Sequence, residues 1–338
     1  MTLAPSDQSG GHLETQFLFD GQLASSLSHW LGEDIKGAQL SKQFQLFYQV
    51  RSYLPIFARQ LLQRARNRRV SPTGDWYLPP ELLEHLAGQA NLNAPVWPNN
   101  APYSLVLTHD VETKEGVEKI DRLAKIEETL GFRSCWNIVP YKYETDAGLI
   151  RSLRERGHEI GVHGYNHDGK LFLNKKTFDA RVPFINQAIE KLGAVGFRAP
   201  MVHRNLSWLQ QLNIEYDSSC FDIDPFQAMP GGVQSWWPFR VGKFIELPYT
   251  LPQDHTLLVT LGESTDRIWQ RKLSEIRRFG GMALVLTHPD YLDSPERLEI
   301  YRRFLESIRR EDAPWQALPS EMANWAANRL GMDVSASH

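Results

Sequence analysis

Two histidines four residues apart, His163 and His167, follow a short apolar run at 159–162. On a helical turn this spacing places both imidazoles on one face, where they could share a metal ion, although such pairs also occur by chance. Asp110 and Glu112 follow another apolar run, and they project to the same face if that strand continues far enough. Two histidines and one carboxylate make a catalytic type of metal site with a position left for water. The two acids could therefore supply one metal ligand and one general base.

Arg198 and His288 each stand directly after a further apolar run. The guanidinium of Arg198 could orient a carboxylate through a bidentate pair, and an ordinary surface ion pair is an equal alternative. His288 has a similar ambiguity, because a single histidine after an apolar strand often has only a structural role. Polar groups after four apolar runs argue together for one site, since the C-terminal ends of barrel strands converge at one mouth.

Short apolar runs alternate with helical segments from Tyr103 onward. The patterns predict strands and helices in alternation, with strands at 103–107, 134–139, 159–162, 196–199, 243–247, 256–259 and 282–287 and helices at 114–130, 146–156, 178–192, 268–279 and 297–309. This alternation implies parallel pairing and an α/β fold, and the count favours a closed or nearly closed barrel over a small open sheet. No G-x-G-x-x-G or P-loop follows a predicted strand, which argues against nucleotide binding.

The first hundred residues differ in texture from the rest. Residues 1–40 are polar, and 42–69 is a predicted helix whose C-terminal end carries Arg59, Arg64, Arg66, Arg68 and Arg69. These cations complement the helix dipole, or they hold the helix against anionic lipid or a polyanionic substrate. A proline-rich stretch follows. We therefore expect a mostly helical N-terminal extension and connector at 1–100 and a main domain at 101–330.

The composition is that of an ordinary globular chain of 338 residues with a formal net charge of −3. The charge balance gives no general attraction to nucleic acid. Two cysteines, Cys135 and Cys220, are too few for a disulfide scaffold or a four-cysteine zinc site. No apolar run suits a secretory signal or a membrane span. We expect a cytoplasmic protein, with peripheral contact to the inner membrane through 42–69 as an alternative.

Five short motifs, taken in order, resemble those of the polysaccharide deacetylase family, also called NodB homology or carbohydrate esterase 4. They lie between residues 100 and 330 and read Thr108-His109-Asp110-Val111, His163-Gly164-Tyr165-Asn166-His167, Arg198-Ala199-Pro200, Tyr216-Asp217-Ser218-Ser219 and Leu286-Thr287-His288. The resemblance implies a distorted (β/α) barrel. The first hundred residues match no motif of the family.

The first motif departs from the family pattern at Val111, where the family has a metal-binding aspartate. Because valine cannot bind a metal, Glu112 is the expected replacement. His109 stands in place of the usual phenylalanine, and its role is open. Met201 replaces the tyrosine after Arg-x-Pro; the family uses the backbone N–H there, so the exchange of side chain need not remove its function.

The resemblance and the chemistry together imply roles for these residues. A divalent metal would be held by Glu112, His163 and His167; zinc suits this set, and cobalt, nickel or iron would also bind. Asp110 would act as general base held by Arg198, and His288 as general acid. Asp217 is the best candidate to orient His288, with Asp222 and Asp224 as alternatives. Substrate or oxyanion contacts would come from Pro200, Met201, Trp236 and Trp237, although the two tryptophans could equally be core.

The expected activity is hydrolysis of an N-acyl group, in the first place N-acetyl, on an amino sugar of a polysaccharide or sugar precursor. A first alternative keeps the fold and changes the bond, to a formyl group on a lipid-linked sugar or a small amide such as a ureide. A second alternative is a catalytically silent sugar-binding protein, which Val111 could signal. The expected partner is a carbohydrate, with no nucleic acid.

Overall fold

The structure is a computed structural model, and it describes residues 13–50, 66, 70, 74–88, 95–310 and 313–332. Ten strands of this described part form one sheet in the order β1-β7-β8-β6-β5-β4-β3-β2-β10, with β9 also paired to β2. The strands are β1 (Thr15–Phe17), β2 (Ser104–Val111), β3 (Cys135–Ile138), β4 (Glu159–His163), β5 (Gly196–Arg198), β6 (Tyr216–Asp217), β7 (Phe239–Val241), β8 (Phe244–Glu246), β9 (Met282–Thr287) and β10 (Trp315–Ala317).

The sheet curls into a nearly closed barrel. Pairing is parallel from β9 through β2, β3, β4, β5 and β6 to β8, whereas β7 and β1 continue it antiparallel. The chain after β8 returns to β9, where the N–H groups of Thr250 and Leu251 both donate to the Leu284 carbonyl at 3.2 Å. These bonds join the two ends of the parallel run without a regular ladder. The predicted distorted (β/α) barrel is therefore confirmed.

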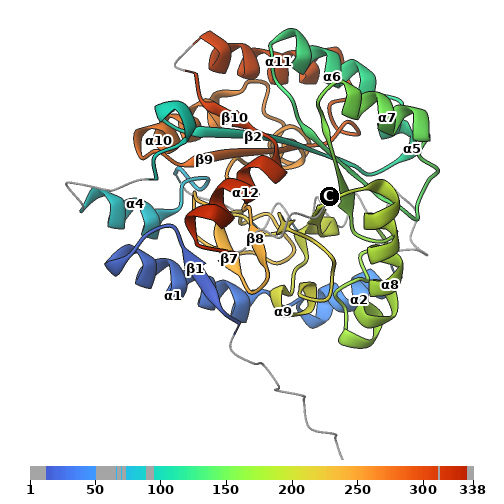
Figure 1. The fold of residues 1–338 in the computed structure, drawn as a ribbon, viewed down its shortest axis with the longest axis horizontal. Coiled ribbons are helices and arrows are strands. Elements are labelled where there is room, and N and C mark those ends of the chain that lie inside the picture. Colours follow the sequence, from blue (N-terminus) through green and yellow to red (C-terminus); the bar gives the residue numbers. More distant parts are fainter. Residues whose placement is uncertain are drawn as a thin grey trace, which may run out of the picture.

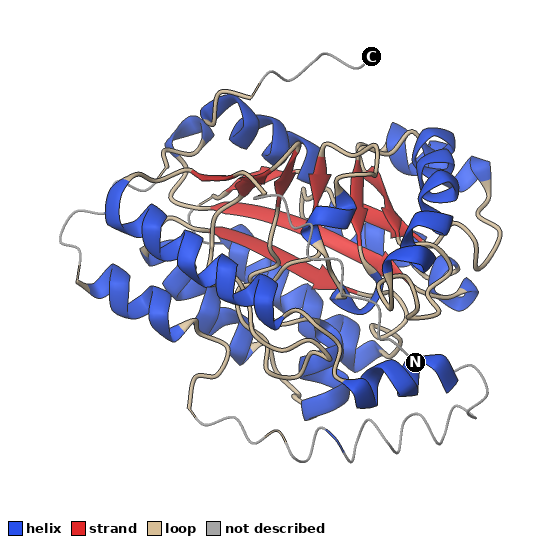
Figure 2. Ribbon diagram, turned by 90° about the horizontal axis from the view of Figure 1, so that it is seen from below, coloured by secondary structure: helices blue, strands red, loops and turns tan. Residues whose placement is uncertain are grey.

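Most helices lie around the sheet (Figures 1 and 2). The α-helices are α1 (Gly21–Gly37), α2 (Lys42–Val50), α4 (Pro80–Ala87), α5 (Lys114–Val117), α6 (Ile120–Thr129), α7 (Ala147–Glu155), α8 (Lys175–Leu192), α9 (Leu206–Leu209), α10 (Arg267–Arg278), α11 (Pro295–Arg310) and α12 (Pro319–Arg329). Helix α12, in contrast, stands in the middle of Figure 1 and contacts β2, β6, β8 and β10. Short 3₁₀ turns lie at Pro98–Asn100 and Pro200–Val202. None of these helices in the described ranges has the length and apolar composition that crossing a membrane requires.

Two predicted elements differ from the structure. The helix expected at 114–130 is two helices, α5 and α6, and Thr113 caps the first by accepting a hydrogen bond from the Gly116 N–H at 3.1 Å. The strand expected at 256–259 is wrong, because His255–Leu261 forms a π-helix. The run is apolar because Leu257 and Leu258 are buried, and a short apolar run does not distinguish a strand from a buried helical turn.

The N-terminal residues share the sheet of the main domain. β1 extends the sheet by pairing with β7, and α1 packs beside it (Figure 1). On α1, the Asp34 carboxylate forms a fully buried ion pair with Arg204, whose Nε lies 3.1 Å from Oδ2. The division of the chain near residue 100 remains a prediction.

Candidate functional site

β2 ends in Asp110 and Val111, and Glu112 follows it directly; the three side chains continue the alternation of the strand. Val111 is fully buried in the main apolar core, whereas Asp110 and Glu112 line a cavity on the opposite face. The alternation explains the departure at Val111, because the side chain at that position points away from the site. Glu112, one residue further on, points into the site and supplies its second carboxylate.

His163 and His167 are brought together by a turn and not by a helix, which corrects the predicted local structure. His163 is the last residue of β4, and the chain then reverses through Gly164 and His167, whose φ angles are 65° and 59°. A Cβ on Gly164 would lie 2.3 Å from Cγ of Pro200, so this position requires glycine. The two imidazole centroids are 5.1 Å apart.

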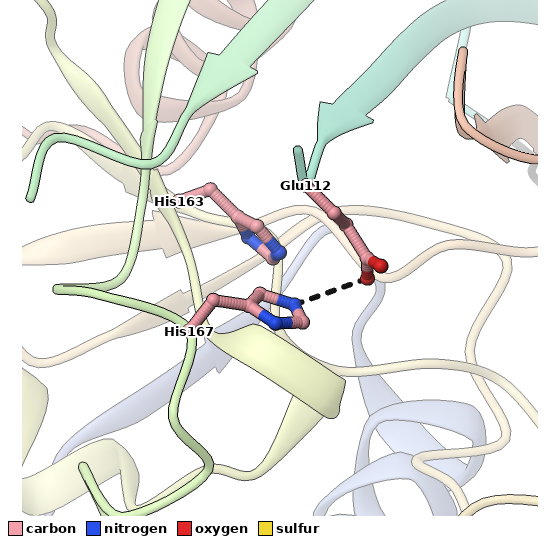
Figure 3. Close-up of side chains that lie close together, drawn as sticks. All are labelled: Glu112, His163 and His167. Carbon is pink, nitrogen blue, oxygen red and sulfur yellow. Dashed lines mark ion pairs between the residues drawn. The ribbon is translucent and has the colours of Figure 1, made fainter. Parts of the chain in front are cut away.

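Glu112, His163 and His167 converge from β2 and β4 (Figure 3). One ligand atom from each lies within 4.8 Å of the others, and His167 Nε2 is 3.0 Å from Glu112 Oε1. His163 Nδ1 lies 3.1 Å from the Arg198 carbonyl oxygen. Because a carbonyl can only accept, Nδ1 carries the proton and Nε2 keeps its lone pair for the centre of the group.

This group has the chemistry of a divalent metal site. The Nε2 atom of His163 is buried and has no hydrogen-bond partner among the described residues. This state is costly, and a metal ion bound to Nε2 would relieve it. Burial lowers the pKa of His163 to about 4, so its imidazole is neutral near pH 7 and able to coordinate. Two imidazoles and a carboxylate are a donor set that suits zinc and its neighbours.

Glu112 is held both at its carboxylate and at its backbone. Tyr291 donates its hydroxyl to Oε2 at 2.9 Å, and the Asp290 carboxylate accepts from the Glu112 backbone N–H at 2.9 Å. Burial alone raises the pKa of Glu112, but His167 and His288 outweigh it and hold the pKa well below its usual value. Glu112 is therefore ionised, with Oε1 left to face His167. Asp290 and Tyr291 were not predicted, and they lie two and three residues after the closing Leu-x-His motif.

Asp110 lies at the centre of a buried polar network. Its Oδ1 accepts from Asn137 Nδ2 at 2.9 Å and from Arg198 at 3.1 Å, and its Oδ2 is 3.6 Å from His163 Nε2. Burial raises the pKa of Asp110, but His163 and Arg198 offset this and lower it overall. The predicted contact between Arg198 and Asp110 is present. Asn137 was not predicted.

Arg198 joins the strands around Asp110. Its guanidinium donates to the Ser218 carbonyl at 2.7 Å, to the Ser218 hydroxyl at 2.6 Å and to the Thr108 hydroxyl at 2.8 Å. The side chain is fully buried. The surface ion pair that was the alternative for Arg198 is thereby excluded.

The partner of His288 is Asp254, which corrects the prediction of Asp217. His288 Nδ1 lies 2.7 Å from Asp254 Oδ1, and the His288 backbone N–H donates to Oδ2 at 2.8 Å. Burial lowers the pKa of His288, but the negative charges of Asp254 and Glu112 outweigh it and raise the pKa to about 9. His288 is therefore protonated near pH 7, with Nε2 3.9 Å from Glu112 Oε1.

The three carboxylates considered earlier for His288 all have other partners. Asp217 accepts from the Ser219 hydroxyl at 2.7 Å, and its strand neighbour is Glu246. Asp222 lies 2.6 Å from the buried Lys272 ammonium, and Asp224 accepts from Tyr249 at 3.1 Å, so these two belong to a separate buried cluster.

Trp236 and Trp237 are core side chains, which corrects the expectation that they form a wall for a sugar ring. They are 0% and 1% exposed. Their indole N–H groups donate to Asp222 Oδ2 at 2.9 Å and to the Gly280 carbonyl at 3.0 Å. Neither side chain lines the cavity of the site. Their ring faces pack against other apolar groups instead.

His109 is also structural, and it lies on the helix side of β2. Its Nδ1 is 2.8 Å from the Thr287 hydroxyl, and its Nε2 is 2.7 Å from Glu127 on α6. The ring stacks on Trp136 with centroids 4.1 Å apart. The open question about His109 is answered by this network, which joins β2, β9 and α6.

A cavity of about 570 Å³ lies over the carboxyl ends of the strands. Its floor includes Asp110, His288 and the three candidate metal ligands Glu112, His163 and His167, which we call the metal-ligand group. Met201 lines it with φ of 56°, and Pro200 packs on Gly164 beside it. The oxyanion role of the Met201 N–H remains a prediction.

α2 contributes to the same cavity through Phe44, Phe47 and Tyr48. Of the predicted helix at 42–69, the structure describes α2, Arg66 and no other residue. Arg59, Arg64, Arg68 and Arg69 therefore lie outside the described residues, as does most of the segment expected at a membrane. Arg66 turns inward and donates to the Phe226 carbonyl at 2.7 Å.

Comparison with known proteins shows the fold. No family model matches the sequence. A crystal structure assigned as a polysaccharide deacetylase from Mycobacterium smegmatis is 22% identical, covers 71% of this chain and 96% of that chain, and superposes with a TM-score of 0.57. The Puue allantoinase is 16% identical over 71% of this chain and 95% of that chain, with a TM-score of 0.55.

A second crystal structure assigned as a polysaccharide deacetylase, from Pseudomonas aeruginosa PAO1, is 17% identical. It covers 71% of this chain and 95% of that chain, with a TM-score of 0.52. Because these neighbours are matched over nearly their whole length at low identity, the likeness is one of fold. The fold is of the NodB-homology, carbohydrate esterase 4 type.

Proposed function

We propose that this protein is a metal-dependent hydrolase that removes an N-acyl group, in the first place N-acetyl, from an amino sugar. The observation that carries the proposal is the group of Glu112, His163 and His167 at the barrel mouth, with Asp110 and His288 beside it. The deacetylase assignments of two structural neighbours support the same class of reaction.

The side chains divide the work of hydrolysis between them. A divalent metal bound by Glu112, His163 and His167 would lower the pKa of a water and polarise the acyl oxygen. Asp110 is ionised and fixed by Arg198, and it takes the proton from the attacking water. The water oxygen bonds to the acyl carbon, and the C–N bond then breaks.

His288 supplies the proton that the departing nitrogen needs. Its Nδ1–H is held by Asp254, so Nε2–H points to the cavity as the acid. The Met201 N–H is the proposed donor to the oxyanion, a kind of contact whose loss typically costs about 10²–10³ in rate. Free acid and amine are the products.

A small cyclic or open ureide is the second candidate substrate. The likeness to an allantoinase favours it, together with a cavity of about 570 Å³ that suits a small molecule. A lipid-linked formyl sugar has weaker support, because the described arginine of the 42–69 segment, Arg66, contacts the protein itself. The silent alternative has weaker support still, because the ligand group and its flanking acid and base are all in place.

The metal assignment is tested by measuring metal content. Elemental analysis by inductively coupled plasma mass spectrometry should find about one divalent metal ion per chain of purified protein. His163→Ala should lose this metal ion, because it removes one of the three ligands. Acetate release from N-acetylated sugars and ammonia or urea release from ureides then separate the two candidate substrates.

His29→Ala is the matched control, because His29 is an exposed histidine of α1 outside the cavity. It should keep both metal and activity. Full metal occupancy in His163→Ala would overturn the ligand assignment.

A further inference from the structure

The lining of the cavity over the metal-ligand group comes from two parts of the chain. Its floor comes from the carboxyl ends of the barrel strands, including Asp110 and His288. A second part of the lining comes from α2, which lies between β1 and β2 in the sequence and presents Phe44 and Phe47. A substrate at the metal-ligand group therefore shares one cavity with aromatic side chains of α2.

α2 is seated on the loop that carries His167. A Cβ on Gly169, two residues after His167, would lie 2.3 Å from Cδ1 of Tyr48, so the Tyr48 ring packs directly on this backbone. Tyr48 also meets the His203 ring edge-on, with centroids 4.8 Å apart. Tyr48 is buried with Met229 in a small apolar cluster. The position of α2 is thus fixed by the same loop that fixes a metal ligand.

Arg66 connects α2 to the other side of the cavity. Its guanidinium lies 5.0 Å above the Phe44 ring and donates to the carbonyls of Phe226 and Gln227. Phe226 and Gln227 themselves line the cavity. Arg66 therefore connects Phe44 of α2 to the loop that carries Phe226 and Gln227. Phe44 and this loop both border the space above the strand ends.

The size of this space limits what can bind. The cavity of about 570 Å³ falls within the roughly 300–1,000 Å³ that is typical of small-molecule pockets. An internal unit of a polysaccharide needs room for the chain to leave on both sides. Phe44 and Phe47 line the cavity, and their rings offer apolar faces on which a sugar ring can stack.

On the premise of the proposed deacylation, we propose that the substrate is a small acylated sugar or the terminal unit of a chain. Internal units of a polysaccharide are excluded by α2, and Phe44 and Phe47 are the residues that set this limit. The walls of the cavity, not the metal-ligand group, decide the length of substrate.

The test uses the full-length, metal-loaded protein with N-acetylglucosamine and N-acetylgalactosamine as monosaccharides, short oligomers and long polymers. Acetate release gives the rate, and mass spectrometry of the oligomers gives the position of the free amine. We expect one amine per chain, at a terminal unit, and a rate per chain that does not rise with length. Amines at internal units would overturn the size limit and leave the proposed function standing. Acetate from no substrate of the panel would overturn the proposed function.

A pair of variants on α2 makes the test specific. Phe47→Ala should lower kcat/KM on the smallest active substrate by about tenfold, the size of one lost aromatic contact, and should allow acetate release from internal units. Leu46→Ala is the control, because Leu46 is 62% exposed on the same helix and outside the cavity lining. Equal product patterns for Phe47→Ala and the unchanged protein would overturn the role of Phe47.

Discussion

At the scale of single residues, the site depends on which nitrogen of each histidine carries a proton. His163 donates from Nδ1 to a carbonyl and keeps a lone pair at Nε2, as a metal ligand must. His288 faces a carboxylate with Nδ1 and keeps both protons to about pH 9. One hydrogen-bond partner for each ring thus leaves His163 with a free lone pair and His288 with a proton at Nε2, although both histidines line the same cavity.

Asp254→Asn tests the acid assignment of His288. In the proposed mechanism His288 acts in its protonated form, so activity should be lost as the pH rises through the pKa of His288. Asp254 is the group that most raises that pKa. Removing this charge lowers the pKa, so the alkaline limb of kcat/KM against pH should move to lower pH. The profile is measured on the best substrate of the panel.

Asp217→Asn is the matched control for this profile. Asp217 bonds to Ser219 and lies beside Glu246, so its neutralisation should leave the alkaline limb in place. A limb that moves with Asp217→Asn and stays with Asp254→Asn would reverse the assignment.

At the scale of elements, the ends of β2, β4, β5 and β9 supply the reactive side chains, and the bodies of the strands stay buried. Parallel pairing aligns these ends at one mouth, so residues far apart in sequence meet there. The neighbouring strands β6 and β8 carry a pair of buried carboxyl groups. Asp217 and Glu246 are paired in register, and both are fully buried.

The Asp217–Glu246 pair should make stability depend on pH. Burial raises the pKa of both carboxyls, and the charge of Asp217 raises that of Glu246 further. Their stabilising contribution is present below the ordinary carboxyl pKa and is lost as the pH rises through the raised values. Glu246→Gln should flatten this decline in unfolding free energy, which is about 1.4 kcal/mol per unit of pKa difference.

Urea unfolding between about pH 5 and pH 9 measures the decline. Glu155→Gln, at an exposed position of α7, should reproduce the slope of the unchanged protein. An unchanged slope in Glu246→Gln would mean that the pair does not hold its proton in the folded state.

At the scale of the whole molecule, the N-terminal segment is part of the barrel and of the site. β1 lengthens the sheet, α1 is held by Asp34 and Arg204, and α2 lines the cavity of the candidate site. The predicted boundary near residue 100 would separate the aromatic side of the cavity from the metal-ligand group. The proposed substrate limit depends on both parts.

Asp34→Ala should destabilise the fold strongly. The Asp34–Arg204 pair is about 1% exposed on each side chain, so loss of Asp34 leaves an uncompensated buried guanidinium, at a cost of about 3–5 kcal/mol. The free energy of unfolding in urea measures the change. Glu33→Ala, which removes the neighbouring exposed partner of Lys36, should leave stability unchanged. Equal stability of the two variants would show that Asp34 does not anchor α1.

The sequence alone determined the fold class and most of the side chains that meet at the site. Asp110, Glu112, His163, His167, Arg198 and His288 could be picked out because each follows an apolar run, and the parallel barrel then brings strand ends together. Such information is local: it depends on spacing along a few residues and on one rule of topology.

Only the tertiary structure decided the partners of these residues. Asp254 reaches His288 across 34 positions, because the chain after β8 crosses to β9 before entering the π-helix. Trp236 and Trp237 went to the core and Phe44 and Phe47 to the cavity, although all four are equally aromatic in the sequence. Several carboxylates and rings had suitable chemistry, and packing over long distances in sequence selects which of them lies within reach.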